Sequence, residues 1–389
     1  MRRSQTEIIL NDLKRKMVFL VGPRQSGKTW LAREISKSYS NPAYLTYDHY
    51  EDRKIIHRES WLPKTDLLVL DELHKMKGWK NFLKGVFDTK PEHLHILVTG
   101  SARLDAFRQT GDSLAGRFLV HHLLPFSPRE LDEIGEPADL DRLIRRGGFP
   151  EPYLAETDID ADRWRQLYAD SLIRTDVLDF ERIHDMRNMQ LVFDMLRHRV
   201  GSPVSMKSIA EDVQAAPNTV KKYIRILEAL YIVFQVLPHS RNIARAILKE
   251  PKIYFFDTGL VSGDEGAKFE NLVAVSLLKH AYRATDETGA PASVHYLRTK
   301  DGREVDFCFV EGERIKAMIE VKTDDSQASR HLKYFHSKYG LKGFQIVRYP
   351  RRERMEDEIE IRAAEGFLRR LALETGIEDY PRSIGGNEK

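Results

Sequence analysis

The chain has 389 residues, of which 41% are hydrophobic and 31% charged, a composition typical of a globular protein with more than one domain. The formal net charge is only +3, so any surface that binds a polyanion has to be local. No apolar run reaches the ~18 residues that span a bilayer, the N-terminus lacks an apolar signal core, and the single Cys308 excludes an internal disulfide. We therefore expect a cytoplasmic protein with no membrane partner.

A phosphate-binding loop is predicted near the N-terminus. The apolar run at 17–21 breaks into GPRQSGKT and continues as the helix-forming WLAREI, so that Gly22, Gly27, Lys28 and Thr29 satisfy G-x-x-x-x-G-K-[ST] in its proper context. Backbone N–H groups and the helix N-terminus would hold phosphate, Lys28 would reach the β- and γ-phosphates, and the Thr29 hydroxyl would take a Mg²⁺ position. The predicted site for ATP and Mg²⁺ consists of Gly22, Pro23, Arg24, Gln25, Ser26, Gly27, Lys28 and Thr29.

Four further short apolar runs follow, at 43–48, 66–73, 94–101 and 117–126, and helical or polar stretches separate them. Buried parallel strands have this pattern. Strands that alternate with helices predict an open α/β sheet whose ligand lies at the carboxyl ends of the strands.

The second of these runs, LLVLDE, ends in two acids. We expect Asp71 to hold Mg²⁺ through its water shell and Glu72 to orient and deprotonate the attacking water. A hydroxyl at the end of the next run, from Ser101 or Thr99, would touch the γ-phosphate or that water. An exposed acidic pair without a catalytic role is the alternative.

The ordered segments GPRQSGKT, LLVLDE, LVTGSAR, SLAGR, LPFSPREL and GGFPE resemble the AAA+ branch of P-loop ATPases, within it a prokaryotic family with a C-terminal domain of unknown function. The resemblance covers nearly the whole chain and implies a 5-1-4-3-2 sheet, a helical lid, and an arginine offered across a subunit boundary in a homo-oligomeric ring, with six the expected number. Arg117 in SLAGR is the first candidate for this finger and Arg103 the second, and a structural ion pair is the alternative for Arg117. Arg146 and Arg174 are candidates for a lid arginine that senses the γ-phosphate.

Residues 187–262 predict a winged helix-turn-helix module, because a short helix, a tight turn and a longer helix precede two strands. Between residues 197 and 252, ten lysines and arginines face four acids, which favours DNA as a partner. A rigid protein–protein spacer is the alternative. Phosphate contacts are expected from Asn218, Thr219, Lys221, Lys222 and Arg225.

The last part of the chain centres on GREVDFCF and AMIEVKTD, which put Asp306 in one strand and Glu320 and Lys322 on one face of the next. Carboxylates so placed would bind Mg²⁺ and generate a hydroxide that attacks a phosphodiester, with the lysine stabilising the charge. Glu270, in a helix-forming run before these strands, is a further candidate ligand. The constellation resembles the PD-(D/E)XK nuclease superfamily, and a purely structural charge cluster is the alternative.

The predicted architecture is an α/β fold with an AAA+ P-loop ATPase core (1–126), a helical lid (127–186), a winged helix-turn-helix module (187–262) and a PD-(D/E)XK-like domain (263–389). The predicted function is ATP hydrolysis coupled to DNA binding or remodelling, with a metal-dependent nuclease-like terminal domain. Two alternatives are a signalling switch whose later domains bind protein or DNA without cleavage, and a DNA-binding motor whose terminal fold only grips DNA.

Overall fold

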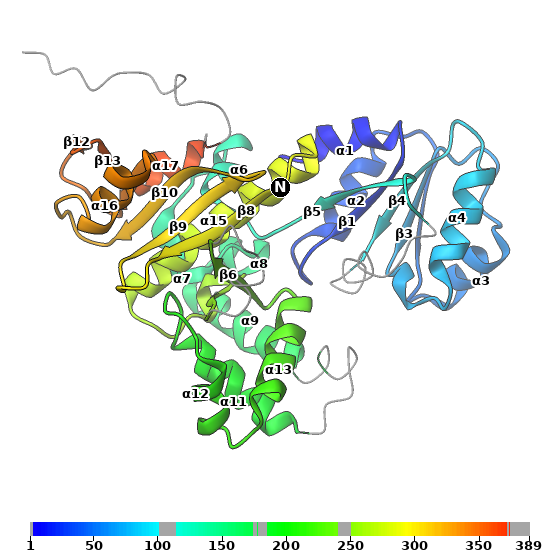
Figure 1. Ribbon diagram of the computed structural model, residues 1–389. Helices are drawn as coiled ribbons and strands as arrows, with labels where there is room; N and C mark the ends of the chain where they lie inside the picture. Colours follow the sequence, from blue (N-terminus) through cyan, green and yellow to red (C-terminus); the bar gives the residue numbers. More distant parts are fainter. Residues whose placement is uncertain are drawn as a thin grey trace, which may run out of the picture.

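The computed structural model describes residues 3–100, 114–173, 177, 185–239, 250–371 and 373. Figure 1 shows two lobes, each built on a β-sheet: the first sheet lies at the right and the larger second sheet at the left. No helix within the described ranges has the length and apolar character needed to cross a membrane.

The first sheet is parallel throughout and has the strand order β2-β3-β4-β1-β5, which confirms the order expected from the sequence. Its strands are β1 (Met17–Val21), β2 (Pro42–Thr46), β3 (Leu67–Asp71), β4 (His95–Thr99) and β5 (Phe118–His122). The surrounding helices are α1 (Thr6–Leu13), α2 (Lys28–Ser36), α3 (Tyr50–Arg58), η1 (Leu73–Lys75) and α4 (Trp79–Thr89).

Both faces of this sheet are covered, because alternate residues of a strand point to opposite sides. On β1, Phe19 packs into a core shared with α3 and α4, whereas Val18 and Leu20 pack into a core shared with α1 and α2. The order of the strands therefore leaves β1 in the interior, with its carboxyl end and the loop after it at one edge of the sheet.

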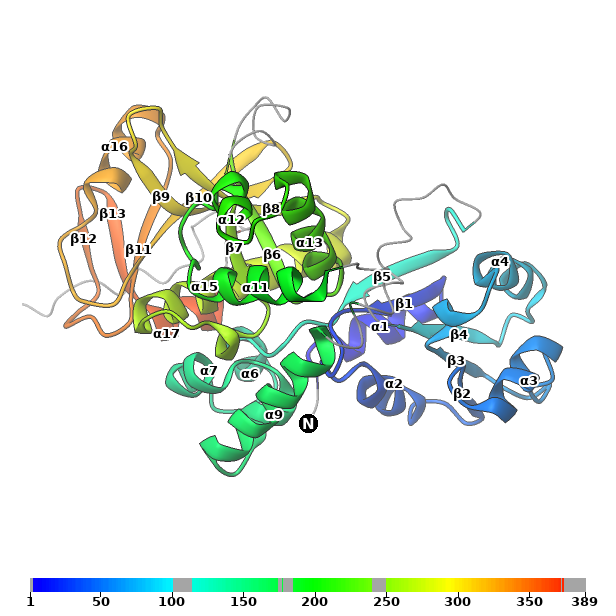
Figure 2. The ribbon, with the colours of Figure 1, turned by 90° about the horizontal axis from the view of Figure 1, so that it is seen from below.

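A group of short helices connects the two lobes. Its members are α6 (Pro128–Glu133), α7 (Leu140–Arg146), α8 (Pro150–Leu154) and α9 (Asp158–Ser171). Three of the four helices begin at a side-chain cap, since Ser127, Asp139 and Thr157 each accept a bond from a backbone N–H in the first turn. Figure 2 shows these helices beside the second lobe at its junction with the first.

Three helices and a hairpin follow: α11 (Met186–Arg197), α12 (Met206–Asp212), α13 (Pro217–Ala229), β6 (Val233–Pro238) and β7 (Lys252–Phe255). Proline at the first position of α13 fixes the start of this helix, because it has no N–H to leave unpaired. The element order is the one that the sequence predicts for this region.

The hairpin belongs to an eight-stranded mixed sheet with the order β12-β13-β11-β10-β9-β8-β6-β7. The other strands are β8 (Ala292–Arg298), β9 (Glu304–Glu311), β10 (Arg314–Lys322), β11 (Gly343–Val347), β12 (Arg354–Glu356) and β13 (Ile359–Ala363). The remaining helices are η4 (Thr258–Leu260), α15 (Glu265–Thr288), α16 (Arg330–Tyr339) and α17 (Ala364–Arg370).

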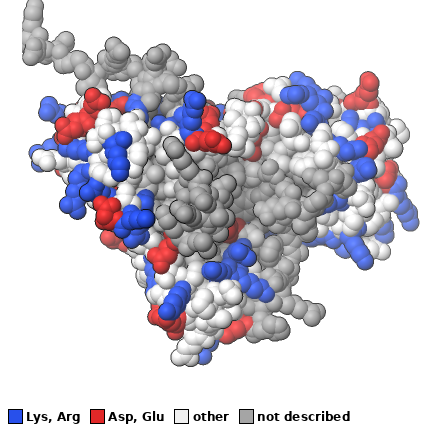
Figure 3. All heavy atoms as spheres, in the orientation of Figure 1, with Lys and Arg blue, Asp and Glu red and all other residues white. Residues whose placement is uncertain are grey.

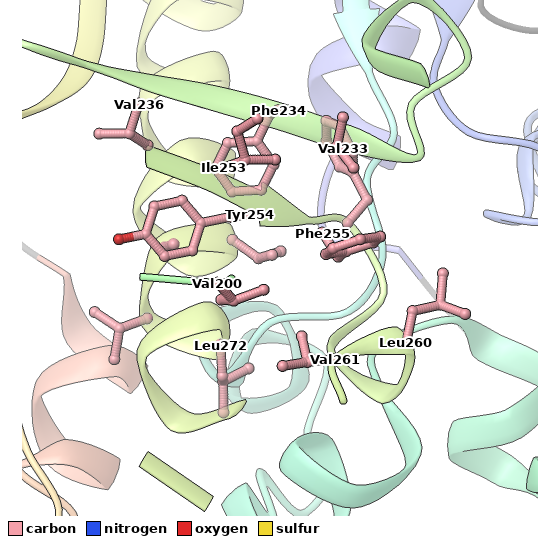
Figure 4. Packing of buried hydrophobic residues seen from close by; sticks show 14 of the residues in the cluster. Val200, Val233, Phe234, Val236, Ile253, Tyr254, Phe255, Leu260, Val261 and Leu272 are labelled. Atoms are coloured by element: carbon pink, nitrogen blue, oxygen red, sulfur yellow. The ribbon is translucent and has the colours of Figure 1, made fainter. Parts of the chain in front are cut away.

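One hydrophobic core runs from Leu124 to Leu373 through all the regions that the sequence predicts as lid, helix-turn-helix and terminal domain. Figure 4 shows part of it, where Val200 lies between the β6–β7 hairpin and Leu272 of α15. Strand β7 also contacts α15, so one core continues across the predicted boundaries at 186/187 and 262/263.

Candidate functional site

The loop after β1 can be built only with glycine at two positions. Gly22 has φ +144°, and a Cβ there would lie 2.3 Å from the carbonyl oxygen of Leu123. Gly27 has φ +96° directly before the first residue of α2. Both conformations are rare for residues with a side chain. The loop therefore approaches β5 closely and presents its backbone N–H groups at the N-terminus of α2.

Lys28 lies buried inside this loop. Its Nζ donates to the carbonyl oxygens of Gly22 (3.0 Å) and Pro23 (2.5 Å). Burial lowers the pKa of Lys28 to about 8, although the nearby carboxylates of Glu72 and Asp71 oppose this shift. A buried ammonium whose bonds within the described ranges go to carbonyl oxygens can bind an anion.

Asp71, at the end of β3, lies where the sequence predicts. Its Oδ2 accepts from the Tyr44 hydroxyl (2.5 Å) and the Thr29 hydroxyl (3.5 Å), and its Oδ1 accepts from the Thr99 hydroxyl. The structure therefore brings Thr29, Asp71 and Thr99 together beside the loop. Tyr44 was not predicted, because a tyrosine on a neighbouring strand carries no motif.

Glu72 follows with φ +56°, a conformation uncommon for residues other than glycine. Its backbone N–H donates to the carbonyl of Thr99 (3.0 Å), which fixes this turn against β4. Burial raises the pKa of Glu72, as suits a carboxylate that accepts a proton. Ser101, Arg103 and Arg174 lie outside the described residues.

A cavity of about 650 Å³ joins the loop to the helices between the lobes. The phosphate-loop side contributes Lys28, Thr29, Asp71 and Glu72 among its lining residues, and α8 and α9 contribute Glu151 and Tyr168. The Tyr168 hydroxyl donates to the carbonyl of Arg24 (3.4 Å). Sequence reasoning missed this side of the site, because the spacing of aromatic residues on α9 is explained equally well by core packing.

The residues present fit a nucleoside triphosphate with Mg²⁺. The glycines keep the loop clear, Thr29 and Asp71 offer the oxygen ligands that Mg²⁺ prefers, and the buried Ser26 hydroxyl has no hydrogen-bond partner within the described part of the chain. The arrangement can therefore bind phosphates, hold a divalent cation and place a base beside them.

Neither described arginine candidate contacts this cavity. Arg117 directly precedes β5 at the opposite end of the sheet, roughly 17 Å from the loop by strand rise, and pairs with Asp88 through two bonds of 2.8 and 3.0 Å. Arg146 is buried and its Nε donates to Asp158 (2.5 Å). In this structure the Arg146 guanidinium holds α7 against the start of α9, and its role in sensing the γ-phosphate stays a prediction.

Sequence reasoning also missed a buried charge network behind the loop. Arg3 donates to the carbonyl of Ser26 (2.6 Å) and to Glu130 of α6 (2.6 Å), and Lys279 of α15 donates to the same carboxylate. Burial alone would raise the pKa of Glu130, but Arg3 and Lys279 lower it to about 2. This network ties the phosphate loop to the long helix of the second lobe.

Helix α13 presents the residues that the sequence selects as candidate phosphate contacts. Asn218, Lys221, Lys222 and Arg225 are exposed, and Thr219 is half-buried. The opposite face of the helix is buried in the core through Val220, Tyr223, Ile224 and Leu227.

The predicted acids of the terminal region do come close together, but a lysine lies among them. Lys252 of β7 lies 3.3 Å from Asp306 and 3.6 Å from Glu270, whereas Lys322 donates to Glu320 (2.9 Å). Within the described ranges, no group of three His, Cys, Asp or Glu side chains is placed to hold a metal ion. In this arrangement an ammonium supplies positive charge among the acids, and the metal site at Glu270, Asp306 and Glu320 stays a prediction.

Comparison with known families divides the chain into three matched regions. Residues 14–132 match an AAA domain, residues 137–266 match a domain of unknown function (DUF8612), and residues 265–364 match another domain of unknown function (DUF4143). With the loop geometry, the first match supports a P-loop ATPase domain of the AAA type in this part of the chain. The C-terminal region matches the DUF4143 model.

Similar proteins occur in a bacterium and in an archaeon. The uncharacterized protein Rv2008c of Mycobacterium tuberculosis is 27% identical over 305 residues, which cover 75% of this chain and 66% of the relative. The chain thus spans just under two thirds of that relative. The uncharacterized protein MJ1544 of Methanocaldococcus jannaschii is 21% identical over 375 residues, covering 85% of this chain and 81% of the relative.

Two solved structures overlap with parts of the chain. Thermotoga maritima RuvB, a Holliday junction branch migration motor, is 18% identical with a TM-score of 0.30, covering 60% of this chain and 87% of its own. The Walker-type ATPase of Pyrococcus abyssi is 13% identical with a TM-score of 0.40, covering 66% and 93%.

Proposed function

We propose that this ATPase hydrolyses ATP with Mg²⁺ and couples the reaction to DNA binding through helix α13. The observation that carries the DNA part is the pair of exposed basic side chains, Lys221 and Arg225, one turn apart on a helix whose other face is buried. Figure 3 shows Lys and Arg side chains gathered in the region of α13. A basic helix anchored in this way supports contact with phosphates of a nucleic-acid backbone.

In the ATPase site, each residue has a role that follows from its position. Lys28 and the loop N–H groups would bind the phosphates, Thr29 and Asp71 would hold Mg²⁺, and Glu72 would take a proton from the attacking water. Bound Mg²⁺ neutralises charge that develops on the phosphate oxygens. Tyr168 connects α9 to the loop through the carbonyl of Arg24, which supports transmission of the nucleotide state to the second lobe.

DNA binding by α13 has a measurable salt signature. We expect a labelled duplex to bind with an affinity that falls steeply with salt, and Lys221→Ala and Arg225→Ala each to weaken binding and reduce the slope of log K against log [salt] by about 1. Fluorescence anisotropy across a salt series measures both quantities. Lys37→Ala is the matched control, because this lysine is exposed on α2 and pairs only with Glu34 among the described residues.

Absence of DNA binding at low salt would remove this proposal and favour a switch whose later regions bind protein. An unchanged slope in both variants would move the DNA contact to another surface.

The same proposal includes assembly into a ring in which Arg117 completes the site of a neighbouring subunit. Because Arg117 lies far from its own loop, it could act only on another copy. We expect Arg117→Ala to lower ATPase activity at least tenfold, on the order of one lost transition-state contact, and to inhibit wild-type protein in mixtures beyond simple dilution.

Asp88→Ala separates this role from a structural one, since it breaks the same ion pair but keeps the guanidinium. Equal losses of activity in the two variants, or a fully active monomer, would show that Arg117 serves only its ion pair.

DNA cleavage is not part of this proposal. The terminal acids do not form a metal-holding group within the described residues, so no hydrolytic step is assigned to them.

A further inference from the structure

Lys252 is the most deeply buried cation of the second lobe's charge cluster. Its side chain is 1% exposed, and its Nζ lies 2.9 Å from Glu304, 3.3 Å from Asp306 and 3.6 Å from Glu270. These three acids come from β9 and α15, whereas the lysine comes from β7. We call this set the Lys252 cluster.

The surroundings of the cluster hold its acids in place by further bonds. The Tyr254 hydroxyl donates to Glu270 (2.6 Å), and the backbone N–H of Val321 donates to Asp306 (2.9 Å). Burial alone would lower the pKa of Lys252, but Asp306, Glu270 and Glu304 raise it above its ordinary value. The ammonium is therefore charged throughout the physiological range and offsets the acids around it.

A divalent cation would need the same space. Mg²⁺ and Mn²⁺ require several oxygen ligands at a little over 2 Å, whereas the acids here stand at distances suited to an ammonium. The Lys252 side chain is itself buried, as are the other residues of β7. Figure 4 shows Ile253 and Phe255 in the shared core and the Tyr254 hydroxyl pointing away from it.

A neighbouring acid, Glu320, has a carboxylate oxygen that a divalent cation could bind. Glu320 is 6% exposed, and its Oε2 has no hydrogen-bond partner in the described part of the chain, while its Oε1 accepts from Lys322 (2.9 Å). Burial, with the Asp306 charge next in importance, raises the pKa of Glu320 to about 7. An unpaired carboxylate oxygen beside Asp306 is a ligand that a metal could use if Lys252 were removed.

We propose that Lys252 is the resident cation of the terminal carboxylate cluster and closes it to divalent metals. The acids that resemble nuclease ligands then join the β6–β7 hairpin to the terminal sheet instead of activating water. Removing the ammonium while keeping the acids should open a divalent cation site, built on Asp306 with Glu270, Glu304 or Glu320 as partners.

The test is Mn²⁺ binding to the full chain without nucleotide, measured by calorimetry and by the melting temperature with and without Mn²⁺. Wild type should show no site that depends on Asp306. Lys252→Met should melt lower than wild type, because the acids lose their partner. It should also gain a Mn²⁺ site that depends on Asp306, with an affinity on the order of a hundredfold above any residual Mn²⁺ binding of wild type at the cluster. Mn²⁺ should raise its melting temperature.

Three variants make the result specific. Adding Asp306→Asn to Lys252→Met should abolish the new site, and Lys252→Arg should not bind Mn²⁺, because it keeps the charge. Lys316→Met, which removes a lysine from the half-buried pair with Glu311 on the same sheet, should leave Mn²⁺ binding as in wild type.

Wild-type binding of Mn²⁺ that Asp306→Asn abolishes would overturn the proposal, whether or not Lys252→Met folds. A folded Lys252→Met protein that gains no Mn²⁺ site would also overturn it.

Discussion

Glu72→Gln should bind ATP as well as wild type and hydrolyse it at least about a hundredfold more slowly, because only the carboxylate accepts the proton of the attacking water. Lys28→Ala should instead lose ATP binding, since it removes a buried ammonium that lies inside the loop and bonds to its carbonyl oxygens. A fluorescent ATP analogue measures binding, and phosphate release measures turnover.

Two variants on α2 serve as controls for these effects. Glu34→Gln and Lys37→Ala alter an exposed ion pair of the same helix and should leave both quantities unchanged. Equal ATPase rates for wild type and Glu72→Gln would contradict the assignment of Glu72 as the base. A Lys28→Ala protein with normal ATP affinity would contradict the assignment of the loop as the phosphate-binding site.

The largest loss of stability is expected from Glu130→Gln. This substitution removes the shared partner of Arg3 and Lys279 and leaves two buried cations uncompensated, at a cost of about 3–5 kcal/mol in the free energy of unfolding. Urea unfolding measures this loss in the free energy of unfolding. Because Arg3 also donates to the carbonyl of Ser26, ATP affinity should fall with stability.

Glu133→Gln is the matched control on the same helix. Glu133 pairs with Arg129 and Arg283 while more than a quarter exposed (28%), so its replacement should cost less than about 1 kcal/mol. Similar losses of stability in the two variants would contradict a special role for the buried network.

The dependence of the free energy of unfolding on pH gives a second test of the Glu130 network. The pKa of Glu130 is about 2 in the folded chain against an ordinary value of 4.5, so its stabilisation is complete above about pH 4.5 and is lost as the pH falls toward 2. The shift corresponds to on the order of 3 kcal/mol. Wild type should lose this increment across that window and Glu130→Gln should not, as unfolding curves at successive pH values would measure. Parallel pH profiles for the two proteins would contradict it.

The nucleotide site was predictable because its determinants are local. The spacing of Gly22, Gly27 and Lys28 specifies one loop between one strand and one helix, and Asp71 and Glu72 come directly after a strand of the same sheet. Parallel strands bring their carboxyl ends to one edge, so the sequence is sufficient to place these groups together.

The missed features depend on contacts between distant parts of the chain. Arg3 and Glu130 are 127 residues apart, and Lys252 and Asp306 are 54 apart. Neither pair belongs to a recognisable sequence motif. A lysine in an apolar strand is typical of a strand at the edge of a sheet. The acids of the terminal region were recognised by type and spacing, but only the fold shows that the hairpin brings an ammonium to them. The shared core also depends on such contacts between distant segments of the chain.

We propose that the nucleotide state and DNA binding are coupled in one molecule. The affinity of Glu72→Gln protein for a labelled duplex at fixed salt, without nucleotide, with ADP and with ATP, measures this coupling. We expect the affinity with ATP to differ from that in the other two states by roughly 5-fold to 150-fold, the usual range for coupled sites. Equal affinities in all three states, or no binding in any of them, would contradict it.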